Sequence, residues 1–396
     1  MIASRRQAFN RAFTEDAFAH FLTDLGARAG VPVDFHLSET PCFFPMSLMD
    51  QLVGFAQTII GDLLDNPEYR AAADAVVPAR FRVPRSESRP TFMIVDVALV
   101  ETERGLEGRL VELQAFPSLY GFQVELAQAH LEAWKLDGVT PFFSGLDRDS
   151  YVRTCQHAIV GPHDPAEVVL LEIDPRHQKT RPDFAITERL WGVRAIDVHD
   201  VEKDGRRLFY RRDGVRTPIA RVYNRVIADE VEHKHVTLPF EFSDDLDVEW
   251  IGGPDWFFRI SKFSIPWLRH PWVPETHFLH EVKELPRDRD NWLLKPLFSF
   301  AGVGIVFAPT DEQIAAIPAD DRRHFILQRR MNFARVINTP DGPTQPEIRL
   351  MFLRDGDGYL PVMPLIRMGR GKMMGVDFNK GLRWVGASAA LMDPAL

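Results

Sequence analysis

The sequence predicts a mixed α/β (α+β) protein, and three observations carry this prediction. Residues 1–80 are expected to be mainly helical, because apolar residues recur at helical spacing between Met49 and Leu63. Residues 168–198 follow the strand–helix–strand order of a βαβ unit, which implies a small parallel sheet. From Trp292 onward, strand patterns alternate with short loops, which indicates a strand-rich final segment.

The elements between these landmarks follow from turn signals. The polar, proline-bounded run Arg82–Pro90 is predicted to be a linker. Two strands joined near Arg104 and a helix over 123–134 come next, and further strands flank the turn at Asp213-Gly214. The late strands are expected over 292–298, 303–308, 325–330, 347–354 and 359–365.

Composition excludes several classes of protein. The formal net charge of −9 weighs against a broad nucleic-acid surface, which needs clustered Lys and Arg. Two cysteines without short spacing, Cys42 and Cys155, weigh against a disulfide framework and against a cysteine zinc site. The N-terminal residues carry charges throughout, and no apolar stretch is long enough for a membrane span. We therefore expect a cytoplasmic protein with neither a nucleic-acid nor a membrane partner.

An acidic hairpin lies within Thr91–Tyr120. Glu112 and Gln114 are two residues apart on a predicted strand, so they share a face. A turn near Arg104 places Asp96 directly across from Glu112, and like charges in that position destabilise a sheet. A Mg²⁺ ion between them would reverse this effect, because Mg²⁺ prefers carboxylate and other oxygen ligands. The alternative is a solvated sheet face, since edge strands often carry charges.

A lysine followed by a glycine turn lies within Asn291–Phe307. Lys295 ends a buried strand pattern, and Ser299, Gly302 and Gly304 follow it. Glycines let backbone N–H groups approach a phosphate, and the lysine adds a point charge. The order of residues fits neither a P-loop nor a Rossmann turn, because the glycines lead into a strand. The remaining interpretations are a glycine-containing hairpin over a nucleotide and a plain β-turn. Together with the acidic hairpin, the first interpretation predicts binding of Mg²⁺ and ATP.

With both segments in view, the chain resembles the circularly permuted ATP-grasp enzymes, the group that includes the synthetase domain of glutathionylspermidine synthase. The run Glu112–Ser118 is similar to the metal-binding run of that group, and Lys295–Ile305 is similar to its Lys-Pro-x-x-Ser-x-x-Gly strand. Ser261–Pro266 resembles the start of the helix that carries an earlier lysine. The chain departs from the group at Gln114, where the family has Asn, and at Phe116-Pro117, where it has Asp-Thr.

The resemblance implies an ATP-grasp fold in permuted order with four segments. These are an N-terminal helical segment (1–90), the metal-binding hairpin part (91–165), a βαβ domain like the one that precedes ATP-grasp folds (166–250), and the lysine and glycine part (251–396). It also implies site roles: Mg²⁺ on Asp96, Glu112 and Gln114; ATP on Lys262, Lys295, Ser299, Gly302, Gly304 and, beside the adenine, Gln328.

The implied activity is carboxylate–amine ligation through an acyl-phosphate, with small-molecule acid and amine substrates such as a peptide or a polyamine. Arginines are expected to hold the carboxylate, because the guanidinium fork matches it. The candidates are Arg225, Arg349, Arg367 and Arg370, of which Arg225 and Arg367 are favoured. Surface ion pairing is the alternative for each. A non-catalytic nucleotide-binding homologue and a phosphotransferase remain open, and the substrates and the oligomeric state are undetermined.

Three further patterns carry less weight. The basic loop Asp174–Pro182 follows the first strand of the βαβ unit, where ligands of parallel sheets bind, but a solvated loop fits as well. His233 and His235 lack a third metal ligand nearby, which favours a surface position. Asp377 and Asn379 resemble a magnesium pair of non-permuted ATP-grasp chains, a role that the early hairpin already fills.

Overall fold

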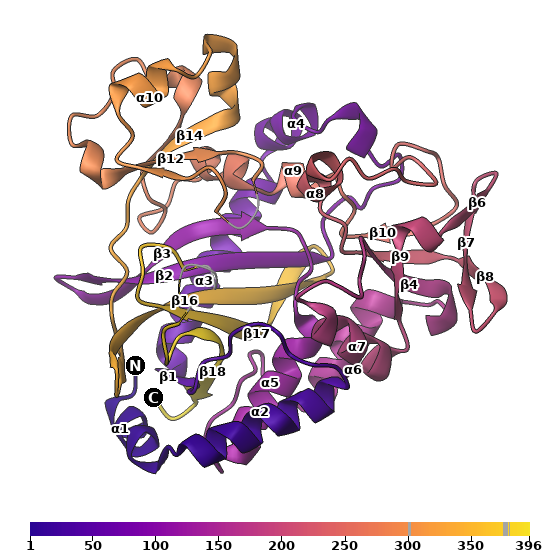
Figure 1. Ribbon diagram of the computed structural model, residues 1–396. Helices are drawn as coiled ribbons and strands as arrows, with labels where there is room; N and C mark the ends of the chain where they lie inside the picture. The colour runs from indigo at the N-terminus through magenta and orange to yellow at the C-terminus, as the bar shows by residue number, and fades with distance from the viewer. Residues whose placement is uncertain (300–301, 375–378, 380) are drawn as a thin grey trace.

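A computed structural model describes residues 1–299, 302–374, 379 and 381–396. A central sheet lies between two smaller lobes (Figure 1). Its strand order is β1-β18-β17-β16-β2-β3, with β15 paired to β16, and every pair is antiparallel except β1 with β18. The strands are β1 (Cys42–Pro45), β2 (Phe92–Thr102), β3 (Gly105–Gln114), β15 (Ile337–Thr339), β16 (Gly342–Asp355), β17 (Gly358–Gly369) and β18 (Gly386–Asp393).

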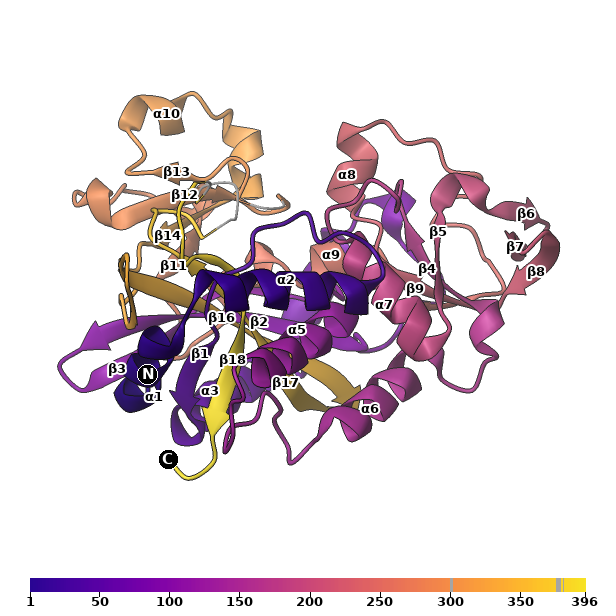
Figure 2. The same ribbon diagram turned by 60° about the horizontal axis from the view of Figure 1, so that its bottom comes forward.

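Helices cover both faces of the central sheet. Helix α3 (Met46–Leu64) packs on one face, where Val95 and Val97 of β2 join its apolar side. Helices α5 (Tyr120–Ala133) and α6 (Arg148–Val160) pack on the other face, with Phe92 and Ile94. Side chains alternate along a strand, so Asp96 belongs to the same face as Phe92 and Ile94. Helix α2 (Glu15–Ala29) lies outside α5 (Figure 2).

The βαβ prediction is confirmed in one of the two smaller lobes. Strand β4 pairs in parallel with β5, and α7 connects the two. The parallel sheet has the order β10-β9-β4-β5, and a small antiparallel sheet β6-β7-β8 extends it. The elements are β4 (Val168–Glu172), α7 (Arg181–Trp191), β5 (Arg194–Asp197), β6 (Glu202–Asp204), β7 (Arg207–Arg212), β8 (Val215–Ile219), β9 (Arg221–Asn224), α8 (Ala228–His233) and β10 (Glu249–Ile251).

The other smaller lobe carries the late lysine, Lys295. Its antiparallel sheet has the order β11-β14-β12-β13, so the strand that follows the glycines is a hairpin partner, as the sequence predicts. The elements are α9 (Trp256–Arg259), a 3₁₀-helix (Lys262–Trp267), β11 (Thr276–Phe278), β12 (Trp292–Pro296), β13 (Val306–Phe307), α10 (Asp311–Ala315) and β14 (Phe325–Arg329).

The central sheet takes strands from three of the four segments expected from the sequence. The N-terminal part contains helices, but its residues 42–45 form β1 of the central sheet. Strands β15 to β18, expected to belong with the late lysine, instead join the acidic hairpin in that sheet. The other N-terminal helices are α1 (Ala3–Ala12) and α4 (Pro67–Ala75). Within the described residues, no helix has the length and apolar character needed to cross a bilayer.

Candidate functional site

The acidic hairpin forms, and it brings the predicted pair together, although through a β-bulge and not by a regular register. Strands β2 and β3 place Asp96 directly opposite Glu112, and the register shifts just after Asp96. Strand β16 lies on the other side of β2 and places Arg349 opposite Asp96. Three charged residues from three strands therefore form one row across the sheet, beyond the end of the apolar core that contains Ile94.

Asp96 is completely buried and paired with two arginines. Nε of Arg349 donates to Oδ1 at 2.8 Å and its Nη2 to Oδ2 at 2.7 Å, while Nη2 of Arg367 donates to Oδ2 at 2.7 Å. Burial alone would raise the pKa of Asp96, but the two guanidinium groups outweigh it and hold that pKa below its usual value. Asp96 is therefore a carboxylate that stays charged in the folded protein.

Sequence reasoning missed Glu347, which joins the same cluster. It lies on β16 opposite Arg367 of β17, and the two form an ion pair. Burial raises the pKa of Glu347 against the effect of Arg367, and the nearby charges of Asp96 and Glu112 raise it further. A signal was present in the sequence, because Glu347-Ile348-Arg349 places two charges on one face of an otherwise apolar strand.

The two predicted lysines face these carboxylates. Lys295 on β12 is buried, and its Nζ donates to Oε1 of Gln328 at 2.5 Å. Burial lowers the pKa of Lys295 to about 8, while the negative charges of Glu112 and Glu347 oppose this shift. The early hairpin and the lobe of the late lysine meet, because the 3₁₀-helix that begins at Lys262 contacts β3 and the backbone N–H of Leu110 on β3 donates to the carbonyl oxygen of Trp272 at 2.8 Å. This lobe lies on the β3 side of the central sheet (Figure 1).

Lys262 approaches from the start of the 3₁₀-helix. Ser261 and Ser264 form a capping box that fixes this helix start. The buried Nζ of Lys262 donates to the carbonyl oxygen of Ser299 at 2.7 Å. Burial lowers the pKa of Lys262, and the carboxylate of Glu112 opposes the shift. Lys262 therefore links the turn after β12 to the acidic hairpin.

The glycines of the turn after β12 both need positive φ. Gly302 has φ +77° and Gly304 has φ +76°, a region that side chains disfavour. A Cβ on Gly304 would also lie 3.0 Å from Cγ of Pro296. Residues 300 and 301, as well as Asp377 of the weak magnesium pair, lie outside the described residues. Asn379 accepts from the backbone N–H of Arg370 at 3.0 Å.

Arg225 contacts a different part of the hairpin. It follows β9, donates from Nη1 to the carbonyl oxygen of Pro117, and lies over the rings of Phe116 and Phe184 at 4.8 Å and 5.7 Å. It thereby connects the parallel lobe to the loop after β3. Arg370 donates to the carbonyl oxygen of Arg383 at 2.8 Å, which indicates a structural role. The expected use of Arg225 for a substrate carboxylate stays a prediction.

The minor candidates have local partners. His233 is exposed and forms an ion pair with Asp229 at 3.0 Å. In the basic loop, His177 contacts Asp174 at 2.7 Å and Arg181 contacts Asp34 at 2.5 Å. These contacts are typical of solvated surfaces.

The expected magnesium ligands differ in their availability. In the described part of the chain, no group of three or more His, Cys, Asp and Glu side chains is arranged to hold a metal ion. Both oxygens of Asp96 already accept from arginines, whose positive charges compete with a metal ion at this carboxylate. Glu112 and Gln114 are half-buried and hydrogen-bonded to each other. Their oxygens fit the usual protein contribution to a magnesium–phosphate site, which is one or two carboxylates.

Comparisons with known proteins support the fold alone. No protein-family model and no curated protein matches the chain. Among solved structures, the chain is similar to a glutathione synthetase-like effector from Globodera pallida in its apo form. The TM-score is 0.59 at 13% identity, over 95% of this chain and 96% of that chain. The likeness therefore extends over the central sheet and both lobes, and it shows a shared architecture.

Proposed function

We propose that the protein is an ATP-dependent carboxylate–amine ligase of the ATP-grasp type, with the permuted order that its sequence resembles. The observation that carries the proposal is the approach of two buried lysines, Lys262 and Lys295, to the carboxylate of Glu112. The fold likeness to a glutathione synthetase-like effector is consistent with it, since the two chains share an architecture.

The nucleotide would lie between the lysine lobe and the central sheet. Lys262 and Lys295 neutralise phosphate oxygens, and the backbone N–H groups around Gly302 and Gly304 add donors. Gln328, which accepts from Lys295, lies on β14, the neighbour of β12, and would contact the adenine. Phosphoryl transfer needs mainly positioning and charge neutralisation, and both lysines serve these ends.

Glu112 and Gln114 are the residues that would hold Mg²⁺, which supplies charge neutralisation on the phosphates when bound. The asymmetry of the site supports this division, because Glu112 faces the lysines while Asp96 is engaged by Arg349 and Arg367. Asp96 as a further ligand stays a prediction that competes with these two ion pairs.

The reaction has two steps. An oxygen of the substrate carboxylate attacks the γ-phosphorus, the bond to the β-phosphate oxygen breaks, and ADP leaves. The amine nitrogen then attacks the acyl carbon, phosphate leaves, and the amine loses a proton as the amide forms. Arg367 and Arg225 are the proposed partners of the carboxylate, because each is buried or half-buried and close to the loop or strands of the hairpin.

The test is ADP release with Mg²⁺-ATP and pools of amino acids, peptides and polyamines. Ligation predicts ADP only when an acid and an amine are both present, and none from Lys295→Ala. ADP release with an acceptor that is neither acid nor amine would instead indicate a phosphotransferase. Nucleotide binding without any ADP release would favour the non-catalytic alternative. The pairing of Asp96 with two arginines motivates this alternative, because it leaves fewer oxygens for a metal ion. Absence of nucleotide binding would refute the proposal.

A further inference from the structure

Two arginines from neighbouring strands converge on one buried carboxylate. Arg349 meets Asp96 through two parallel hydrogen bonds, and Arg367 shares the second oxygen. A planar guanidinium that makes two parallel bonds to a carboxylate is fixed in orientation as well as in position. Asp96 therefore fixes how Arg349 lies, and together with Glu347 it holds Arg367.

The same contacts give Asp96 and Glu112 different surroundings. The arginines use three of the roughly four lone pairs of the Asp96 carboxylate, so a cation there would have only one left on Oδ1, and it would lie beside two positive charges. Glu112 forms no ion pair with an arginine among the residues that the structure describes, and it lies near both lysines instead. Of the two carboxylates that face each other across β2 and β3, Glu112 therefore has the oxygens that are more available to a cation.

The arginines retain unused donors. Arg367 has a side chain that is 28% exposed, and its Nε is buried without a hydrogen-bond partner in the described residues. Arg349 uses Nε and Nη2 on Asp96, which leaves its Nη1 hydrogens. The cluster also has more cations than carboxylates, which favours an anionic ligand. The cations are Lys262, Lys295, Arg349 and Arg367, and the carboxylates are Asp96, Glu112 and Glu347.

We propose that Asp96 is a positioning residue that holds Arg349 and Arg367 side by side as a clamp for an oxyanion of the substrate. The oxyanion is the carboxylate that receives the phosphoryl group or the phosphoryl group itself, since a guanidinium fork matches both. This inference deepens the proposed function and rests on it for the identity of the anion. The clamp itself rests on the contacts of Asp96.

The first experiment asks whether Asp96 holds a metal. Mn²⁺ is titrated into the protein with the non-hydrolysable analogue AMP-PNP, and free Mn²⁺ is followed by electron paramagnetic resonance. Glu112→Gln is expected to weaken Mn²⁺ binding at least about tenfold, and Asp96→Asn to change it less than about twofold. Equal weakening by both variants would identify Asp96 as a metal ligand and overturn the inference.

The second experiment asks whether the arginines bind an oxyanion. Equilibrium dialysis measures radiolabelled inorganic phosphate on the complex with Mg²⁺-ADP, in which the nucleotide covers the lysines. Asp96→Asn and Arg367→Lys are expected to weaken phosphate binding at least about tenfold, because each removes part of the fork geometry. Asp96→Glu keeps the carboxylate and should restore part of the affinity. Unchanged phosphate binding in Asp96→Asn and Arg367→Lys, or none in the unaltered protein, would refute the clamp.

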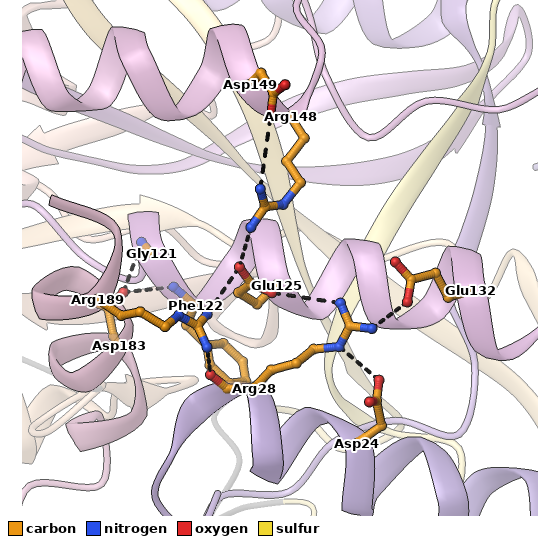
Figure 3. Close-up of polar contacts among 10 residues, drawn as sticks. All are labelled: Asp24, Arg28, Gly121, Phe122, Glu125, Glu132, Arg148, Asp149, Asp183 and Arg189. Carbon is orange, nitrogen blue, oxygen red and sulfur yellow. Dashed lines mark hydrogen bonds and ion pairs between the residues drawn. The ribbon is translucent and has the colours of Figure 1, made fainter.

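Glu125 of α5 offers a matched control for loss of a buried arginine–carboxylate cluster. Its side chain is 3% exposed and lies among Arg148 at 2.8 Å, Arg189 at 3.1 Å and Arg28 at 3.8 Å, between helices outside the site (Figure 3). Glu125→Gln should lower the melting temperature and leave Mn²⁺ and phosphate binding unchanged. Equal loss of phosphate binding in Glu125→Gln and Asp96→Asn would show an effect of stability alone.

Two outcomes separate this inference from the proposed function. If the unaltered protein does not bind AMP-PNP, the nucleotide site is wrong, and phosphate dialysis without nucleotide still compares Arg367→Lys with the unaltered protein. If Asp96→Asn does not fold, Arg367→Lys carries the test, because it leaves the paired bonds between Asp96 and Arg349 in place.

Discussion

Nucleotide binding should weaken as the pH rises through 8, because Lys295 loses its charge. Burial lowers the pKa of Lys295 to about 8, even though Glu112 opposes the shift. Only the protonated amine can neutralise a phosphate, so above this pH the protein must take up a proton when it binds nucleotide. Lys295→Arg removes this requirement, since a guanidinium stays protonated throughout the range.

The magnitude follows from uptake of one proton. About one pH unit above the pKa, about a tenth of Lys295 is charged, so the Kd should rise about tenfold, or about 1.4 kcal/mol. Burial also lowers the pKa of Lys262, so loss of its charge would make the Kd rise more steeply with pH.

Isothermal titration calorimetry of AMP-PNP from about pH 7 to about pH 9.5, at constant ionic strength and Mg²⁺ concentration, measures the slope. The unaltered protein should lose about tenfold in affinity per pH unit above pH 8, and Lys295→Arg should show a slope that is smaller by about one. A flat profile in the unaltered protein, or the same slope in Lys295→Arg, would refute the assignment of Lys295 to the phosphates.

Three further predictions concern stability and the glycine turn. Without nucleotide, the free energy of unfolding should rise between about pH 8 and about pH 10.5, because the unfolded chain keeps the Lys295 proton longer. Lys295 contributes at most about 1.4 kcal/mol per pH unit, so urea titration of Lys295→Met should show a smaller rise, the part due to Lys262. The pKa of Asp96 is lowered by Arg349 and Arg367 against burial, so its contribution to stability is complete above about pH 4 and is lost as the pH falls through its folded value; Asp96→Asn should lack this acid-dependent loss in melting temperature. Gly304→Ala should lower the free energy of unfolding by about 1 kcal/mol or more, because φ is +76° and the new Cβ would lie close to Pro296. AMP-PNP binding, measured by calorimetry, should weaken as well. Gly214→Ala is the control, because Gly214 also has positive φ but no atom near its Cβ position, so the steric part of the cost should be absent.

The local part of the site could be predicted from the sequence. Asp96 and Glu112 do lie opposite each other, but the hairpin turns between Thr102 and Gly105, so regular pairing would place Val111 opposite Asp96. A β-bulge at Val111, which the sequence did not indicate, brings Glu112 into that position. The alternation of side chains placed Glu112 and Gln114 on one face. The lysine strand and its glycine hairpin were predictable for the same reason, since both depend on neighbours in the chain.

The partners of these residues could not be predicted, because they come from distant strands. Nothing in the local pattern around Asp96 indicates that β16 pairs with β2 and supplies Arg349. Several strands were missed, among them two of the central sheet: β18 consists largely of small residues, and β1 has four residues and ends at Pro45. The position of Arg225 against Pro117 also depends on how a separate lobe packs on the hairpin.

The pairing of Asp96 with Arg349, 253 residues later in the chain, has a consequence for biosynthesis. While the ribosome is still translating the middle of the message, the β2–β3 hairpin has one apolar edge without its neighbour, and its buried acid has no counter-ion. The candidate site and the interior of the sheet should therefore be completed together, late in synthesis and in one cooperative event. Nascent chains that end before β16 should need a chaperone to stay unaggregated, whereas release of the full polypeptide should remove that need.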